Sequence, residues 1–157
     1  MPKREKGAPP QIKPKRLGDY LEIMSKSVFQ SGMSWDVVEA KWPGTREAFG
    51  GFDAEAVARM SDREIDTLAT DTRVIRNRRK IAAVVENANR MIALDAEYKG
   101  FRKYLRSFDG DYYALVKDLR KQFKFLGDSG CYIFLYVVGE PVPEYHAWRE
   151  AQGAPHR

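Results

Sequence analysis

A loop that contains glycine joins two predicted helices near the end of the chain, and its residue types suit the binding of an anion. The loop spans residues 123–130, with Lys124 near its start and Gly127 at its centre. Glycine lets the backbone approach a phosphate closely, and the amino end of the next helix presents unpaired N–H groups. The pattern is that of a helix-hairpin-helix, and an ordinary connection between two helices is the alternative.

Asp128 in the same loop has the wrong charge for a phosphate site. Its carboxylate repels an anion unless it caps the helix that follows. Asp128 or Ser129 is in the right place for such a cap, because an apolar run begins at Cys131 and Gly139 follows it. No strand with alternating polarity is predicted elsewhere, so we expect a capped helix over this run and not a buried strand.

Two clusters of basic residues also suit a phosphate backbone. The first consists of Arg73, Arg76, Arg78, Arg79 and Lys80, and the second of Lys117, Arg120, Lys121 and Lys124. Such clusters bind polyanions, but a solvated helix surface often carries the same charges. Each cluster is therefore a candidate interface, with an ordinary exposed helix face as the alternative.

The composition indicates one domain with a basic extension. The chain has 157 residues, 43% of them hydrophobic and 31% charged, which is enough for one substantial core. The formal net charge is +5, and residues 1–16 alone account for it. This segment contains four prolines and buries too little apolar surface to become ordered. We expect a flexible arm over residues 1–16, a helical domain over 17–140 and an irregular tail over 141–157.

Apolar spacing and capping residues predict an all-α fold of short and moderate helices. Leu17, Tyr20, Leu21, Met24 and Val28 recur at the spacing of one helical face. Further helices are predicted from Ser34 to a stop at Pro43 and Gly44, over 54–60, 61–68 and 75–92, from the turn at 108–110 to Phe123, and over 131–138.

The chain shows no pattern for membrane insertion or secretion. Its longest apolar run has eight residues, 131–138, whereas about 20 are needed to cross a bilayer. Residues 1–16 contain no hydrophobic leader. The single cysteine, Cys131, lies inside the apolar run, so we expect a buried thiol and no disulfide. We expect a cytoplasmic protein without membrane contact.

Several short motifs occur in an order that resembles one protein family. They are Gln30-Ser31-Gly32-Met33-Ser34-Trp35, Ala48-Phe49, Phe52-Asp53, residues 74–81 with Asn87-Ala88, and residues 123–127 with Cys131-Tyr132. Together they resemble the 3-methyladenine DNA glycosylase I family of the helix-hairpin-helix superfamily, over residues 17–138. The resemblance implies two small helical lobes with a base pocket between them, no cofactor, and duplex DNA with alkylated bases as the partner.

The resemblance also implies roles for individual residues. Trp35 matches a tryptophan that stacks on an extruded base, with a core tryptophan as the alternative. Ser27 and Gln30 are placed beside it in the base pocket. The residues placed on the DNA backbone are Lys124, Gly127, Ser129, Arg76 and Arg78.

The sequence departs from the family pattern at several places, among them a connection around Asp109-Gly110 that is shorter than is usual in the family. Ser27 stands where members carry an acidic residue, and a hydroxyl cannot supply that charge. The basic arm replaces an aromatic segment that contributes to the pocket. Glu144 replaces a zinc-binding histidine, and His146 and His156 have no cysteine partner, so we expect no metal site.

Ser27 and Glu144 are the candidates for a catalytic role. Glu144 follows the second hairpin helix, where relatives in the wider superfamily keep an aspartate, and a solvated tail residue is its alternative. Three other acids, Glu22, Asp36 and Glu39, could replace the missing carboxylate, and Glu140 follows the second hairpin helix as Glu144 does. N3-alkylated adenine is cationic and already a good leaving group, so its excision does not require a strong general acid.

The leading hypothesis is a divergent glycosylase that flips an alkylated adenine of the 3-methyladenine class and hydrolyses its N-glycosidic bond. The departures predict reduced or retargeted activity. A non-catalytic, damage-sensing DNA-binding domain that keeps the hairpin and Trp35 is the first alternative, and a helical protein-interaction module is the second. We expect the protein to act as a monomer.

Overall fold

All regular structure in residues 8–153, the part that the computed structural model describes, is helical. Residues 1–7 of the predicted arm and residues 154–157, which include His156, lie outside the described residues. The helices are α1 Leu17–Gln30, α2 Trp35–Ala48, α3 Ala54–Ala58, α4 Asp62–Ala69, α5 Arg78–Tyr98, α6 Phe101–Leu105, α7 Tyr112–Gln122, α8 Asp128–Val137 and α9 Tyr145–Gly153. The predicted all-α fold is confirmed.

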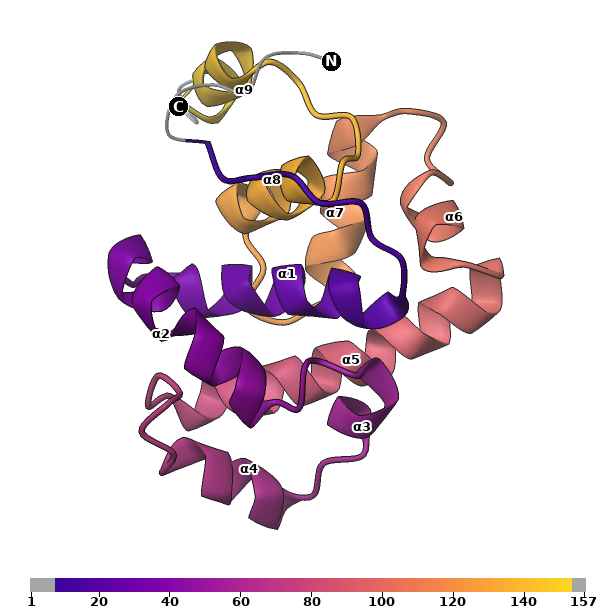
Figure 1. Cartoon of the computed structure of the whole chain (residues 1–157). Helices are drawn as coiled ribbons and strands as arrows, with labels where there is room; N and C mark the ends of the chain where they lie inside the picture. Colours follow the sequence, from indigo (N-terminus) through magenta and orange to yellow (C-terminus); the bar gives the residue numbers. More distant parts are fainter. Residues whose placement is uncertain (1–7, 154–157) are drawn as a thin grey trace.

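Helix α1 lies at the centre of the molecule, packed against α5 on one side and α8 on the other (Figure 1). Helices α2, α3 and α4 gather on the α5 side, and α7 and α9 lie on the α8 side. Leu21 and Met24 of α1 are fully buried in a core cluster that includes side chains from both groups. The two groups of helices therefore share one hydrophobic core.

Helix α2 continues past the predicted stop at Pro43 and Gly44 and ends at Ala48. Trp42 is buried, and the single hydroxyl proton of Thr45 is shared between the backbone oxygens of Lys41 at 2.8 Å and Arg73 at 3.1 Å. A side chain at position 44 would lie 3.1 Å from Cβ of Arg73, so glycine permits this close packing. Tertiary contacts thus outweigh the local helix-breaking residues.

The capping residues are found largely where the sequence predicts them. The carboxylate of Asp53 accepts a hydrogen bond from the Ala56 amide, and Ser61 with Glu64 forms a capping box. The long helix α5 begins later than predicted, because the side chain of Asn77 caps it and Ile75 lies before it. Helix α6 is absent from the sequence prediction. These differences leave the order of the predicted helices unchanged.

The described part of the predicted arm lies bound to the domain. The Ile12 amide donates to the backbone oxygen of Val137 at 2.8 Å, and the Gln11 side chain donates to that of Tyr136. Further along, Arg16 donates to the backbone oxygen of Gly51 at 2.6 Å. The last carbonyls of a helix lack partners within it, so the carboxyl end of α8 provides acceptors for this segment. Local composition gave no sign of these distant acceptors.

The tail that the sequence predicts to be irregular contains the helix α9. Both oxygens of Glu144 accept hydrogen bonds from backbone amides, those of His146 and Ala147. Trp148 is buried with its ring 4.4 Å from that of Tyr132 on α8. A capped amino end and one buried tryptophan explain why this short segment is helical.

The apolar run at 131–138 is a helix, as predicted, and forms most of α8. Its N-cap is Gly127 and not Asp128 or Ser129, and no side chain caps it. Cys131 is buried, and burial raises the pKa of its thiol to about 12. Within residues 8–153, no helix has the length and apolar character of a membrane span.

Candidate active site and nucleic-acid interface

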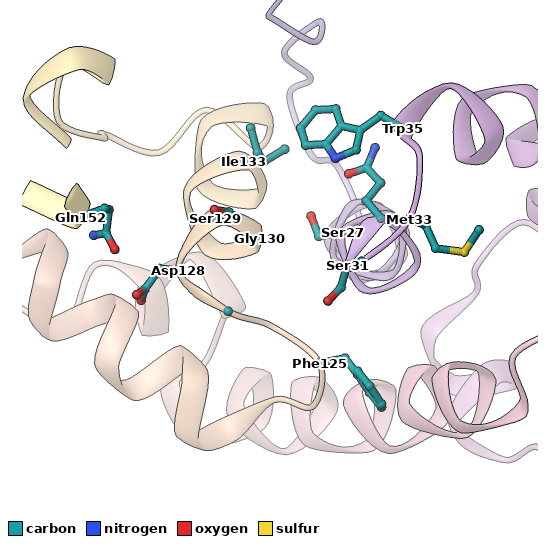
Figure 2. Close-up of a pocket in the computed structure, with 13 residues that line it drawn as sticks. Ser27, Ser31, Met33, Trp35, Phe125, Asp128, Ser129, Gly130, Ile133 and Gln152 are labelled. Carbon is teal, nitrogen blue, oxygen red and sulfur yellow. The ribbon is translucent and has the colours of Figure 1, made fainter. Parts of the chain in front are cut away.

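A cavity of about 700 Å³ lies between the end of α1, the start of α2 and the loop that precedes α8 (Figure 2). Its lining includes an indole, a phenyl ring, hydroxyls, amides and hairpin backbone. The residues are Ser27, Gln30, Ser31, Gly32, Met33, Trp35, Phe125, Gly127, Asp128, Ser129, Gly130, Ile133 and Gln152. The hairpin and Trp35, which the sequence places far apart, thus share one cavity.

Trp35 is the first residue of α2 and is 43% exposed. The other tryptophans, Trp42 and Trp148, are buried at 8% and 6% exposure. Figure 2 shows the Trp35 ring beside the cavity, on the side where α1 ends. Trp35 therefore has a ring available to a ligand, and the alternative of a core tryptophan does not fit its exposure.

Ser27 and Gln30 lie on the same face of the last turns of α1 and border the cavity. Each residue is mostly buried by its neighbours, with 4% and 8% exposure. A side chain added at Gly130 would lie 3.8 Å from Cβ of Ser27, so α8 approaches α1 closely here. The predicted pocket residues are thus brought together, and Ser27, where the resemblance implies an acidic residue, brings a hydroxyl to the cavity.

The hairpin backbone is held by Asn87, which sequence reasoning named only as part of the resemblance. Asn87 lies in α5 at 1% exposure. Its side-chain amide donates to the Lys124 carbonyl at 3.1 Å, and its side-chain oxygen accepts from the Lys124 amide at 2.8 Å. A buried amide in an otherwise apolar helix face was the signal in the sequence, because such a group must find partners.

The amino end of α8 faces the cavity at the other side of the hairpin. Gly127 is its N-cap, and Gly127, Ser129 and Gly130 line the cavity. Asp128 does not cap the helix; its carboxylate accepts a hydrogen bond from the Arg120 guanidinium at 3.1 Å. The repulsion that the sequence predicts between Asp128 and an anion is thus weakened by a neighbouring cation. Amides near Gly127 remain suited to a phosphate.

The first basic cluster is divided by the fold. Arg78, predicted to contact DNA, pairs with Asp66 at 2.6 Å between Nε and Oδ1. Lys80 is buried, and its ammonium donates to the backbone oxygens of Phe29 and Ser31 at the end of α1. Burial lowers the pKa of Lys80. The structure therefore gives Arg78 and Lys80 internal partners.

Two exposed members of this cluster have no ion-pair partner within the described part of the chain. They are Arg76 and Arg79, both exposed. Arg79 lies 5.7 Å from the ring centre of Phe125. The predicted hairpin cation Lys124 is also exposed. These side chains, and not the whole cluster, remain available to an external anion, and Arg79 is the one placed beside a residue that lines the cavity.

The acidic candidates from the sequence do not line the cavity. Glu144 caps α9 with both oxygens, and these backbone hydrogen bonds lower the pKa of Glu144. Glu140 is buried and pairs with Arg106 at 3.0 Å. Capping engages Glu144 and an internal ion pair engages Glu140, and the catalytic role that the sequence suggests for Glu144 stays a prediction.

The remaining acids near Trp35 are Glu22, Glu39 and Asp36, and none of them lines the cavity. Glu22 accepts hydrogen bonds from Trp42 and Arg46, and Glu39 pairs with Lys26 at 2.6 Å. Asp36 is in the first turn of α2, where a negative charge suits the helix dipole. Among residues 8–153, no group of three or more histidine, cysteine, aspartate or glutamate residues is placed to hold a metal ion.

Known proteins share both the sequence pattern and the fold. A family model described as methyladenine glycosylase matches residues 13–114. The DNA-3-methyladenine glycosylase of Haemophilus influenzae is 31% identical over 130 residues, with 70% of each chain covered. DNA-3-methyladenine glycosylase 1 of Escherichia coli is 30% identical, with the same coverage of each chain.

The fold of this chain is also similar to that of a solved glycosylase structure. The structure of 3-methyladenine DNA glycosylase I from Staphylococcus aureus is 26% identical to this chain, has a TM-score of 0.72 and covers 82% of this chain and 79% of its own. The helical fold is that of a DNA glycosylase. The chain belongs to the methyladenine glycosylase family.

Proposed function

We propose that this protein is a base-excision repair glycosylase that removes alkylated adenine of the 3-methyladenine class from DNA. The observation that carries the proposal is the cavity that Trp35 and the hairpin residues Gly127 and Ser129 line together. A glycosylase must hold a nucleotide outside the duplex, which requires a surface for the base and a grip on the backbone. Membership of the family supports the same activity.

The described side chains supply these two requirements from separate elements. Trp35 of α2 stacks on the extruded base, while Ser27 and Gln30 of α1 offer hydrogen-bonding groups to its edge. Amides at Gly127 and Ser129, with the ammonium of Lys124, bind the DNA backbone. Arg76 supplies a further backbone contact. The base and its backbone are thus held on opposite sides of one cavity.

The chemical step does not require a strong general acid, because the alkylated base is already cationic. The C1′–N9 bond breaks, and its electron pair stays on the base, which leaves as a neutral molecule. Water adds to C1′ and releases its proton to solvent. The positive charge thereby moves from the base to the sugar during the step, and the Ser27 hydroxyl oxygen can stabilise it only as a dipole. We therefore expect slower excision than in a relative with a carboxylate there.

A damage sensor without catalysis is the second candidate function. The observation that favours it is the hydroxyl of Ser27 at the acidic position. Among the described residues that line the cavity, the single carboxylate is that of Asp128, which is paired with Arg120. A protein of this kind would bind the flipped nucleotide without breaking its bond.

Release of the free base from methylated duplex DNA separates the two candidates. We expect the purified protein to release 3-methyladenine faster than the spontaneous rate, measured by chromatography of the soluble fraction. Ser27→Glu should raise this rate, because it restores a charge that stabilises the developing cation. Tight binding to methylated DNA with release at the spontaneous rate would establish the sensor instead.

Trp35→Ala tests the base surface. Loss of one stacked base costs about 1–3 kcal/mol, so we expect release to fall by about tenfold or more. Tyr113→Ala is the matched control, because Tyr113 is an aromatic residue of similar exposure that does not line this cavity. Equal binding to undamaged duplex by both variants would show that Trp35 acts on the flipped base. A loss of thermal stability in Trp35→Ala that accompanies weaker binding to undamaged duplex would instead mark Trp35 as a structural residue.

We further propose the setting in which this activity takes place. Duplex DNA is the partner because a base must be extruded to reach the cavity. Residues 17–140 are the unit that carries the cavity, with α9 adding Gln152 to its lining. We propose a monomer in the cytoplasm, since one flipped base needs one cavity. Sedimentation with and without a short duplex measures the stoichiometry, and a second copy per duplex would contradict it.

A further inference from the structure

Phe125 stands at the lip of the cavity in a backbone conformation that aromatic residues rarely adopt. Its φ is 55°, in the left-handed region, and it is 38% exposed. A bulky residue in this region is strained, and such residues persist where the surrounding structure fixes them. Figure 2 shows Phe125 and Trp35 on opposite sides of the cavity, with Ser27 and Ser31 between them. The ring is thus presented outward at some conformational cost.

The buried side chain of Asn87 fixes the backbone that presents this ring. It is bonded to both the amide and the carbonyl of Lys124, the residue immediately before Phe125. Asn87 is 1% exposed, so these two bonds are shielded from water. The conformation of the hairpin at Phe125 is therefore set by α5 and not by the loop alone.

The same helix supplies a cation on one face of the ring. The Arg79 guanidinium lies 5.7 Å from the ring centre of Phe125. The residues on each side of Arg79 are engaged elsewhere, Arg78 with Asp66 and Lys80 with the end of α1. Within the described chain, Arg79 forms no ion pair with a carboxylate. Its remaining donors are available to an anion at the lip.

The charge of Arg79 decides which part of the DNA suits this pair. The Arg79 guanidinium already occupies one face of the Phe125 ring and repels a cationic base. Phe125 is therefore poorly suited to stack on the alkylated base. A neutral base or sugar packs well on the open side of Phe125, and a phosphate suits Arg79. These groups lie next to each other in the nucleotide that flanks an extruded one.

We propose that Phe125 and Arg79 form a second DNA contact that binds the nucleotide flanking the extruded base. The Phe125 ring packs against its base or sugar, and the Arg79 guanidinium binds its phosphate. This inference rests on the proposed function, because it assumes that the cavity receives a base from DNA. It assigns to Arg79 the backbone contact that the sequence assigns to Arg78.

Binding to a duplex with a tetrahydrofuran abasic site tests the contact without requiring catalysis. Phe125→Asn removes the ring and keeps a residue that tolerates positive φ, so the fold should be retained. We expect its Kd for this duplex, measured by fluorescence anisotropy, to rise about tenfold. Tyr113→Ala, an exposed aromatic residue outside this cavity, is the control and should bind as the wild type does.

The salt dependence of binding tests the arginine. Arg79→Ala should reduce the slope of log affinity against log salt by about 0.9, the value for one phosphate contact. Arg78→Ala removes the same charge from the adjacent position and should leave the slope unchanged, because Asp66 already holds that side chain. Wild-type affinity in Phe125→Asn together with a wild-type slope in Arg79→Ala would overturn the proposal.

These outcomes are separate from those of the base-release assay. A wild-type protein that fails to release alkylated adenine, but loses abasic-site affinity in Phe125→Asn, would refute the enzyme and keep the flanking contact. A protein that releases the base normally in both variants, with unchanged binding, would keep the enzyme and refute the flanking contact.

Discussion

The two basic clusters, residues 73–80 and residues 117–124, look alike in the sequence and behave differently in the fold. In the first, Arg73 pairs with Asp71 and Glu47, both at 2.8 Å. Arg78 pairs with Asp66, and Lys80 is buried against the end of α1. In the second, one cation is paired among the described residues, Arg120 with Asp128. Two clusters of similar composition thus leave different shares of their cations unpaired.

The difference follows from the elements that surround each cluster. Residues 73–80 run into the start of α5, where α4, α2 and the end of α1 supply carboxylates and backbone oxygens. Lys117 and Lys121 lie on α7, and both are exposed. A cation with an internal partner stabilises the fold, whereas a solvated cation remains available to a polyanion. Density of charge along the sequence does not separate these two cases.

Lys80→Ala is the change with the largest expected effect on stability. It removes the ammonium that donates to two carbonyls at the end of α1, which we expect to cost about 1.5–3 kcal/mol in the free energy of unfolding. Urea denaturation measures this loss. The neighbouring Arg79→Ala should change stability by no more than about 0.5 kcal/mol. Equal effects would mean that the cluster is not divided as described.

Asn87→Ala should weaken the hairpin while leaving the charges of both clusters intact. It leaves the Lys124 amide and carbonyl without their buried partner, and we expect a loss of about 1–3 kcal/mol in stability. Hydrogen exchange followed by NMR should show faster exchange of the Lys124 amide. Asn89→Ala is the control, since Asn89 is an asparagine of the same helix that bonds to Ala58 and Val85. An unchanged Lys124 amide would contradict the positioning role of Asn87.

Lys124→Ala should affect DNA binding and Arg73→Ala should not. The first removes an exposed hairpin cation, so we expect the salt slope of binding to fall by about 0.9. The second removes a cation that two carboxylates already neutralise. Anisotropy titrations on undamaged duplex at several salt concentrations provide both slopes. A larger change in Arg73→Ala would show that the first cluster is the main interface.

The smallest expected effect is on the acid titration of Asp71. Hydrogen bonds from Arg73 lower the pKa of this carboxyl to about 2, from an ordinary value of 3.8. The charged form is favoured in the folded state, so its contribution to stability is present above pH 3.8 and is lost as the pH falls through about 2. Arg73→Ala should return the pKa of Asp71 toward 3.8. Carboxyl NMR shifts measure the change, and a pKa that stays near 2 would contradict it.

Local sequence signals predicted the helices well because each signal acts within a few residues. The caps at Asp53 and Ser61 and the helix over the 131–138 run are confirmed. The continuation of α2 through Pro43, the bound segment at Gln11 and the helix α9 were missed. The first two depend on partners far away in the sequence, and α9 combines the local cap at Glu144 with the packing of Trp148 on Tyr132.

The candidate site was partly accessible from the sequence. The resemblance placed Trp35, Ser27, Gln30 and the hairpin near one another, and all of them line one cavity. The capping role of Glu144 was not predicted, because the sequence analysis expected no helix after residue 140. Asn87 was identified from the sequence only as part of a motif. Its hydrogen bonds to the Lys124 backbone could not be predicted without knowing which loop lies against α5.

The sequence by itself determined that the chain folds into helices, where most of them begin, and which family pattern they carry. These features depend on periodicity and on contacts between close neighbours along the chain. Only the tertiary structure decided which cations remain available, which acids are already engaged and how Phe125 is presented beside Arg79. Pairing of charges and burial of polar groups depend on distances between remote segments, and those distances exist only after the helices have packed.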